Sequence, residues 1–145
     1  MDTEFADKFK TAVQSNDTQL ALQTLDQACA RGYSVNDPLP TSPKSFENNW
    51  TPHFWACLCP TTAVLSSILD QHRGKVDVRD SSGYTPLLFA GFHGKFPAVR
   101  CLVEHGADIH AQSQYGETLE DLVLKKPYNE RERELREYVE KLLRT

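Results

Sequence analysis

The stretch from Asp80 to Ile109 constrains this chain more than any other part of it. Thr85 and Pro86 are suited to start a helix, because a threonine hydroxyl can accept from an unpaired N–H of the first turn and proline has no N–H to leave unpaired. Gly94 and Gly106 are suited to end helices, since glycine adopts the left-handed conformation without steric cost. The stretch therefore predicts two short helices joined by a tight turn.

Each of these two helices has one apolar face. Leu87 and Ala90 lie three positions apart in the first helix. Val99, Leu102 and Val103 follow at i, i+3 and i+4 spacing in the second helix. Each of the two helices is therefore expected to bury one face.

The run Asp80-Ser-Ser-Gly-Tyr-Thr-Pro-Leu-Leu-Phe-Ala, with Gly106-Ala-Asp-Ile after it, resembles an ankyrin repeat. That repeat is about 33 residues long and carries a Thr-Pro-Leu-His-x-Ala core. The resemblance implies an all-α fold, a solenoid of stacked helix-turn-helix units linked by hairpin fingers. It also implies an open grooved face that binds another protein, with no built-in chemistry.

Copies of the motif recur along the chain. Thr51-Pro52 lies about one repeat length before Thr85-Pro86, and Gly116 lies one repeat length after Gly83. We therefore expect residues 1–145 to form a single ankyrin-repeat domain of four units. Their approximate bounds are 1–36 for the N-terminal cap, 47–79, 80–112, and 113–145 for the C-terminal cap.

The last unit has the features of a cap. Glu120 stands one repeat length after Leu87, and a charge in place of that leucine indicates that one side of this unit is exposed to water. Asn129, with Glu132 three positions later, resembles a capping box at the start of a final helix. Apolar residues then recur at helical spacing from Leu135 to Leu143, which predicts a one-faced helix that closes the stack.

Residues 37–49 form a proline-rich segment where a repeat would have a short finger. Pro38, Pro40 and Pro43 forbid a helix there and favour an extended chain. One interpretation is a tolerated surface insertion, because long loops cost little for each added residue. The other is an extended binding finger, because unusually long loops are often functional.

Composition narrows the function classes. The chain has 145 residues, 39% of them hydrophobic and 25% charged, which is ordinary for a soluble globular protein. A net charge of −4 argues against a broad nucleic-acid surface. No apolar run approaches the ~18 residues that suggest a membrane span. The N-terminus lacks the pattern of a secretory signal. We therefore expect an intracellular protein, cytoplasmic or nuclear, that is a monomer when free.

The four cysteines show no spacing typical of a disulfide framework or a zinc site. They are Cys29, Cys57, Cys59 and Cys101. We expect reduced thiols, no metal and no cofactor. No hydrolase elbow or phosphate-binding loop is present in the sequence, so an enzyme is not expected.

Two alternatives remain open. Cys57 or Cys59 could form a nucleophile–base pair with His53, which lies one helical turn before Cys57. His53 also occupies the place of the core leucine, so a repeat irregularity explains it as well. The second alternative is polyanion binding through Lys125 and Lys126.

The resemblance also implies which side chains line the binding surface, since ankyrin arrays use the fingers and the exposed side of each first helix. Carried over to this sequence, these partner-binding residues are Trp50 and Leu58, with Cys59 beside them; Ser81, Ser82, Tyr84, Phe92 and His93; and Tyr115, Glu117, Lys125 and Lys126. The function expected is that of an adaptor, an inhibitor or a dedicated chaperone of one partner protein.

For three of these residues the sequence leaves alternatives. Trp50 or Phe92 could fold inward and pack under the finger instead of facing a partner. His93 could be a solvated imidazole or one satisfied in the core. Exposed Trp and Tyr, by contrast, are favoured at the centres of protein interfaces.

Overall fold

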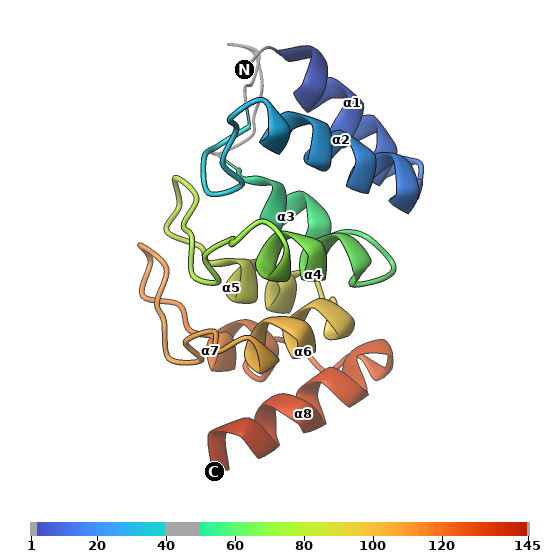
Figure 1. Cartoon of the computed structure of the whole chain (residues 1–145). Helices are drawn as coiled ribbons and strands as arrows, with labels where there is room; N and C mark the ends of the chain where they lie inside the picture. Colours follow the sequence, from blue (N-terminus) through green and yellow to red (C-terminus); the bar gives the residue numbers. More distant parts are fainter. Residues whose placement is uncertain (1–2, 40–49, 145) are drawn as a thin grey trace.

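The computed structural model describes residues 3–39 and 50–144, and within them all regular structure is helical (Figure 1). This confirms the predicted all-α class. The elements are α1 (Thr3–Gln14), α2 (Thr18–Ala30), α3 (Pro52–Cys57), α4 (Ala63–Asp70), α5 (Pro86–Phe92), α6 (Phe96–Glu104), α7 (Leu119–Val123), the 3-10 helix η1 (Glu130–Glu132) and α8 (Arg133–Arg144).

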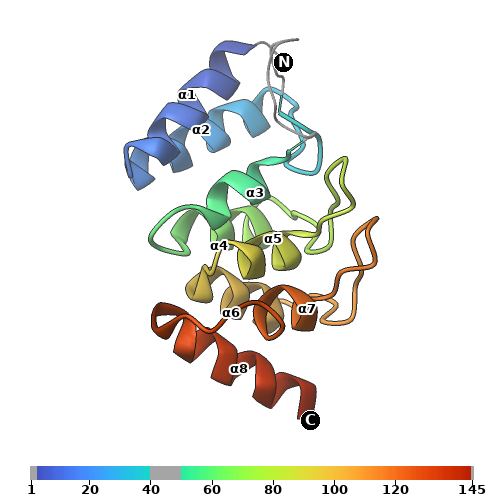
Figure 2. The same cartoon turned by 180° about the vertical axis from the view of Figure 1, so that it is seen from behind.

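The described helices pair as α1 with α2, α3 with α4, α5 with α6 and α7 with α8, and the pairs stack from the N-terminus to the C-terminus (Figures 1 and 2). Helices α1, α3, α5 and α7 contact one another in series and form the inner layer. Helices α2, α4 and α6 form the outer layer, and α8 packs on α7 at the end of the stack. The loops after α4 and α6 project to one side as hairpin fingers. The predicted helical solenoid is therefore confirmed.

The helix boundaries have the causes that the sequence predicts. The buried Thr85 hydroxyl accepts a hydrogen bond from the Leu88 N–H at 3.3 Å, and Pro86 occupies the first turn. Gly94 and Gly106 follow α5 and α6 with φ of 68° and 89°, in the left-handed region. The same cap recurs at Thr118, which starts α7.

The capping box is at Thr118, and the expectation of one at Asn129 is wrong. Thr118 accepts from the Asp121 N–H, and the Asp121 carboxylate accepts from the Thr118 N–H. Asn129 instead accepts from the Arg131 N–H at the start of η1. The Glu132 carboxylate turns away from Asn129 because it pairs with Lys126 at 2.8 Å.

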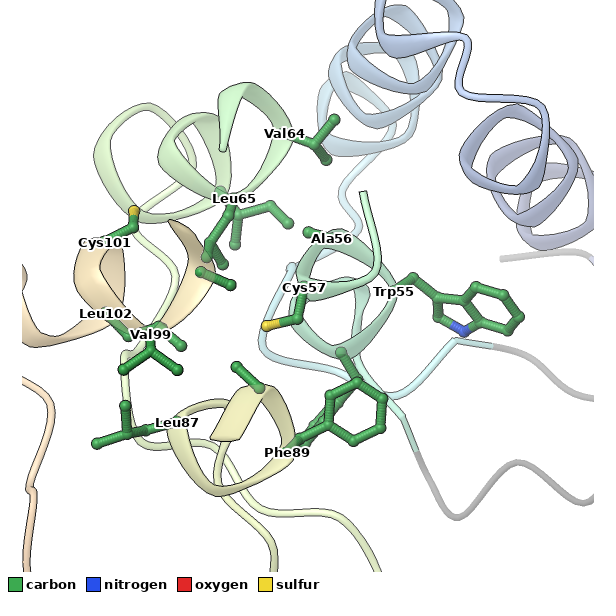
Figure 3. Close-up of a cluster of buried hydrophobic side chains, with 14 of the residues drawn as sticks. Trp55, Ala56, Cys57, Val64, Leu65, Leu87, Phe89, Val99, Cys101 and Leu102 are labelled. Atoms are coloured by element: carbon green, nitrogen blue, oxygen red, sulfur yellow. The ribbon is translucent and has the colours of Figure 1, made fainter. Parts of the chain in front are cut away.

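The hydrophobic core runs between the two helix layers. In Figure 3, Cys57 of α3, Leu65 of α4 and Leu87 of α5 converge with side chains of α6, and Trp55 points away from this cluster. Close approach needs small residues in the inner layer. A Cβ atom on Gly91 would lie 2.6 Å from a Leu119 methyl carbon, so glycine lets α5 and α7 touch.

Most of the proline-rich segment, residues 40–49, lies outside the described residues. Its two flanks meet, because the Leu39 N–H donates to the Trp50 carbonyl oxygen at 2.9 Å. Leu39 itself is buried in the core. The described chain on either side of residues 40–49 therefore meets at neighbouring points of the fold. Whether residues 37–49 also serve as a binding finger stays a prediction.

Replacing Thr85 by alanine should lower the free energy of unfolding by about 1 kcal/mol, because the Leu88 N–H loses its cap. Urea denaturation followed by circular dichroism measures this change. Thr62→Ala is the matched control, since Thr62 precedes α4 without forming a side-chain cap. An equal loss in both variants would show that the cap is not the cause.

Candidate interaction surface

The finger after α4 is shaped by one buried carboxylate. Asp80 is 9% exposed, and its Oδ1 atom accepts from the N–H groups of Ser82 at 2.9 Å and Tyr84 at 3.0 Å. Such side-chain to backbone bonds make a turn without help from a sheet. They hold Ser81 at the exposed edge of the finger and fix the backbone position of Tyr84.

Successive fingers are bonded to each other. The Gln114 N–H donates to the Ser82 carbonyl oxygen at 3.1 Å. The Arg79 guanidinium donates to the carbonyl oxygens of Gly83 and Gln112, both at 2.7 Å. Gly83 has a φ of 76°, and a Cβ atom there would lie 2.7 Å from the Gln114 nitrogen. The two fingers therefore form one rigid edge, with Tyr115 on the outer finger 67% exposed.

A chain of aromatic rings leads from the core to the surface. The Trp50 ring packs edge-on against Phe89 at 5.0 Å between centroids, and Phe89 contacts His93 at 4.4 Å. His93 contacts Phe92 at 5.1 Å, and Phe92 faces Tyr84 at 6.5 Å. Each of these five rings therefore contacts the next one along the surface. We call these five residues the aromatic strip.

Exposure within the strip is greatest at Phe92 and His93, whereas Phe89 is only 5% exposed. Trp50 is half-buried and packs against the core, as one of its two interpretations expects. Phe92 is 55% exposed, so the idea that it folds under the finger is wrong. Leu58, one repeat earlier than Phe92, is half-buried, and Cys59 beside it is too. The accessible apolar surface is therefore centred on Phe92.

A hydrogen bond to a carboxylate orients the outer end of the strip. The Tyr84 hydroxyl donates to Glu117 Oε1 at 2.7 Å, which joins the two fingers through their side chains as well. Burial and this bond raise the pKa of Tyr84 to about 12, so the hydroxyl keeps its proton at neutral pH. Ser113 also donates to Glu117 Oε1 at 3.4 Å.

The imidazole of His93 is less basic than usual. Burial lowers its pKa first, and the nearby ammonium groups of Lys95 and Lys126 lower it further. His93 is therefore neutral at pH 7 and stacks on Phe89 as an aromatic ring rather than as a cation. It belongs to the apolar part of the surface.

The lysines of the closing unit are already paired. Lys125 lies 2.7 Å from Asp121, and Lys126 lies 2.8 Å from Glu132. Lys126 also approaches the Phe92 carbonyl oxygen at 3.5 Å. Because each ammonium has a carboxylate partner, the pair supplies little net positive charge, and the polyanion alternative gains no support from this arrangement.

The repeat pattern and the paired helices match a known family. A family model described as ankyrin repeats, in three copies, matches residues 9–113, which is more than half of the chain. The chain belongs to the ankyrin-repeat family. Ankyrin repeats generally serve as protein-binding modules.

Several ankyrin-repeat relatives share part of this sequence. The chain is 44% identical over 59 residues to human ankyrin repeat domain-containing protein 29, and 38% identical over 61 residues to the zebrafish protein of that name. It is 37% identical over 57 residues to the bovine ankyrin repeat domain-containing protein 49. These matches cover 39–42% of this chain and 20–24% of the relatives, so the chain spans about a fifth of their length.

In this ankyrin-repeat protein the thiol-enzyme alternative has no structural support. His53 Nδ1 lies 2.7 Å from the Thr51 hydroxyl, whereas the Cys57 thiol points at the Pro86 carbonyl oxygen at 3.9 Å. Burial raises the pKa of both the Cys57 and Cys59 thiols, so neither is a ready nucleophile at neutral pH.

Two other features are absent from residues 3–39 and 50–144. This part of the chain holds no cluster of three or more His, Cys, Asp or Glu side chains that could bind a metal ion. It also holds no helix with the length and apolarity that a membrane crossing requires.

The sequence reasoning missed the residues that stiffen the surface. Arg79 bonds two fingers through its guanidinium. Lys10 lies over the Trp55 ring at 5.9 Å, which covers the inner layer beside the strip. The available signal for Arg79 was weak: it directly precedes the finger aspartate, and Gln112 occupies the equivalent position one repeat later.

Gly83→Ala should destabilise the protein more than Gly116→Ala. Both glycines have a φ of 76°, so alanine costs each about 1–2 kcal/mol of backbone strain. Only Gly83 also faces a neighbouring finger, where the added methyl group costs about 1–3 kcal/mol more. Urea denaturation measures the loss of unfolding free energy in each variant. Equal losses would mean that the fingers can part freely.

His53 should make the protein sensitive to acid. Burial lowers its pKa to about 4, only partly offset by the Lys75 backbone, and its Nε2 atom is buried without a hydrogen bond of normal geometry. An unfolded histidine binds a proton near pH 6.5, so the unfolded state gains stability as pH falls from 6.5 to 4. The free energy of unfolding should therefore fall by about 3 kcal/mol over this pH range.

Two variants test this assignment. His53→Leu and His53→Gln both remove the titrating group and should flatten the dependence of unfolding free energy on pH between 6.5 and 4. Leucine and glutamine differ in packing and polarity. A flattening that both variants share is therefore due to the loss of the titrating imidazole and not to a change in side-chain volume. A wild-type slope retained in both variants would assign the acid sensitivity to other groups.

Proposed function

We propose that this chain binds a partner protein through the aromatic strip and the finger edge beside it. The observation that carries the proposal is Phe92, an apolar side chain that is 55% exposed yet held by packed rings on both sides. A rigid aromatic anchor loses little conformational entropy on binding, which is why such residues dominate interface energetics.

The surroundings of Phe92 indicate what the partner segment carries. Leu58, one repeat earlier, is partly buried against the core, and we propose that an apolar side chain of the partner binds beside Phe92 and Leu58. Glu117 supports a polar contact at the rim, because both hydrogen bonds that its carboxylate accepts use Oε1 and its Oε2 atom accepts from none of the described residues. An apolar anchor with a donor or cation next to it fits this surface.

We assign the other expected residues to the edge of the same surface. Tyr115 and Ser81 are exposed on the fingers, whereas Ser82 is half-buried and uses its backbone to hold the next finger. Lys125 and Lys126 enter the proposal as paired charges at the rim. An adaptor, an inhibitor and a dedicated chaperone all share this binding step. We infer that it takes place inside the cell, in the cytoplasm or nucleus, and that the free chain is a monomer.

Site-directed photo-crosslinking tests the surface. A benzophenone amino acid at position 92 should form a discrete crosslinked protein product in cells. The same residue at position 128 is the matched control, because Tyr128 is an equally exposed aromatic, 60% accessible, on the loop after α7. The product recovered at position 92 is then identified and its binding measured by calorimetry.

Phe92→Ala should weaken binding of that protein by at least tenfold, which corresponds to about 1.4 kcal/mol. Tyr128→Ala should leave the affinity within about twofold. If the alanine at position 92 leaves the affinity unchanged, or if both crosslinking positions give the same product, the aromatic strip is not the binding surface.

A further inference from the structure

Two acid–histidine bridges join successive outer helices, on the layer opposite the inner helices. His72, just after α4, lies 2.8 Å from Asp26 of α2 through its Nε2 atom. His105, just after α6, lies 3.0 Å from Asp70 of α4 through the same atom. The two histidines are one repeat period apart, so they occupy equivalent positions. The bridges link the second helix pair to the first and the third to the second.

His105 differs from His72 in what its other ring nitrogen meets. The Nδ1 atom of His105 lies 2.7 Å from the Cys101 carbonyl oxygen, which belongs to the last turn of α6. Its two nitrogens thus face two acceptors, a carbonyl and a carboxylate. A neutral imidazole has one N–H and can satisfy only one of them, whereas an imidazolium donates to both.

The charges around His105 favour the cation. Asp70 faces it from α4, and Glu104 precedes it on α6; both raise its pKa, with the Cys101 carbonyl as the largest cause. Burial opposes this shift. His105 is also the C-cap of α6, where the helix dipole favours positive charge.

Other titratable groups lie near the same place. A cavity of about 490 Å³ beside His105 is bordered by Arg100 of α6 and Glu134 of α8. Arg100 is paired with Glu104 at 3.1 Å, so its charge is largely balanced. The Cys101 thiol lies 3.8 Å from His105 Nδ1, and burial raises the pKa of that thiol, which keeps it neutral.

We propose that His105 is a pH-dependent clamp between the second and third helix pairs, closed when its imidazole is protonated and loosened when it is neutral. In the closed state the ring joins Asp70 of α4 to the carbonyl end of α6. In the neutral state one of the two bonds is lost. Because α6 backs α5, which carries Phe92, the clamp acts on the packing that holds the aromatic strip.

The sign of the effect follows from proton binding. A histidine that binds its proton more tightly in the folded state stabilises the fold fully below the unfolded pKa of about 6.5. That stabilisation disappears as pH rises through the higher folded value. The clamp therefore strengthens on mild acidification, in the direction opposite to the effect of the buried His53.

The direct test is an NMR titration of the full chain, following the His105 ring protons from pH 5.5 to 9. We expect the midpoint to lie above 6.5. In Asp70→Asn it should fall by about half a unit or more, because asparagine still accepts a hydrogen bond but carries no charge. Asp26→Asn is the matched control and should leave the His105 midpoint in place.

Thermal unfolding gives a second measurement. The Tm of His105→Gln should fall below that of the wild type by about 2–4 °C at pH 6, and by clearly less at pH 8.5. Comparing the two pH values for each protein cancels the contribution of His53, which both share. If His105→Gln does not fold, the NMR titrations of the wild type and of Asp70→Asn still test the proposal. A midpoint at or below 6.5, or one unaffected by Asp70→Asn, overturns the proposal.

Discussion

The structure depends on each helix pair burying its apolar face against the next pair. Helices of five to nine residues, such as α5, α6 and α7, are too short to be stable alone in water, so their order comes from the stack. Gly91 shows how close this packing is, since any side chain there would meet Leu119. The spacing of the fingers on the surface follows from this packing of one helix pair on the next.

The same short helix serves the core and the surface. In α5, Leu87 and Leu88 are fully buried, whereas Phe92 at the last position is mostly exposed. Phe89 is also buried, and its ring contacts both Trp50 and His93. An exposed ring is therefore attached to the core through other rings, and a partner that binds it meets a surface already ordered before binding.

The sequence was sufficient for features set by local chemistry and by the repeat period. The caps at Thr85 and Gly94 and the paired helices were predicted because each depends on residues within one unit. The capping box at Asn129 failed because a tertiary contact overrode it: Glu132 is drawn to Lys126 on the preceding loop, which no helix rule anticipates. The inward or outward direction of Phe92 was also undecidable from spacing, since it depends on where Tyr84 of the finger lies.

The histidines show how one residue type acquires different behaviour from its place in the stack. His53 is enclosed at the centre and is kept neutral by the cost of burying a charge. His93 lies among aromatic rings and lysines, and its pKa is lowered by burial and by the charges of Lys95 and Lys126, so it is neutral as well. His105 stands at a helix end between a carbonyl and a carboxylate, where a charge is favoured. A repeat scaffold thus offers core, groove and outer edge at regular intervals, and the chemistry of a residue is decided by which of the three it occupies.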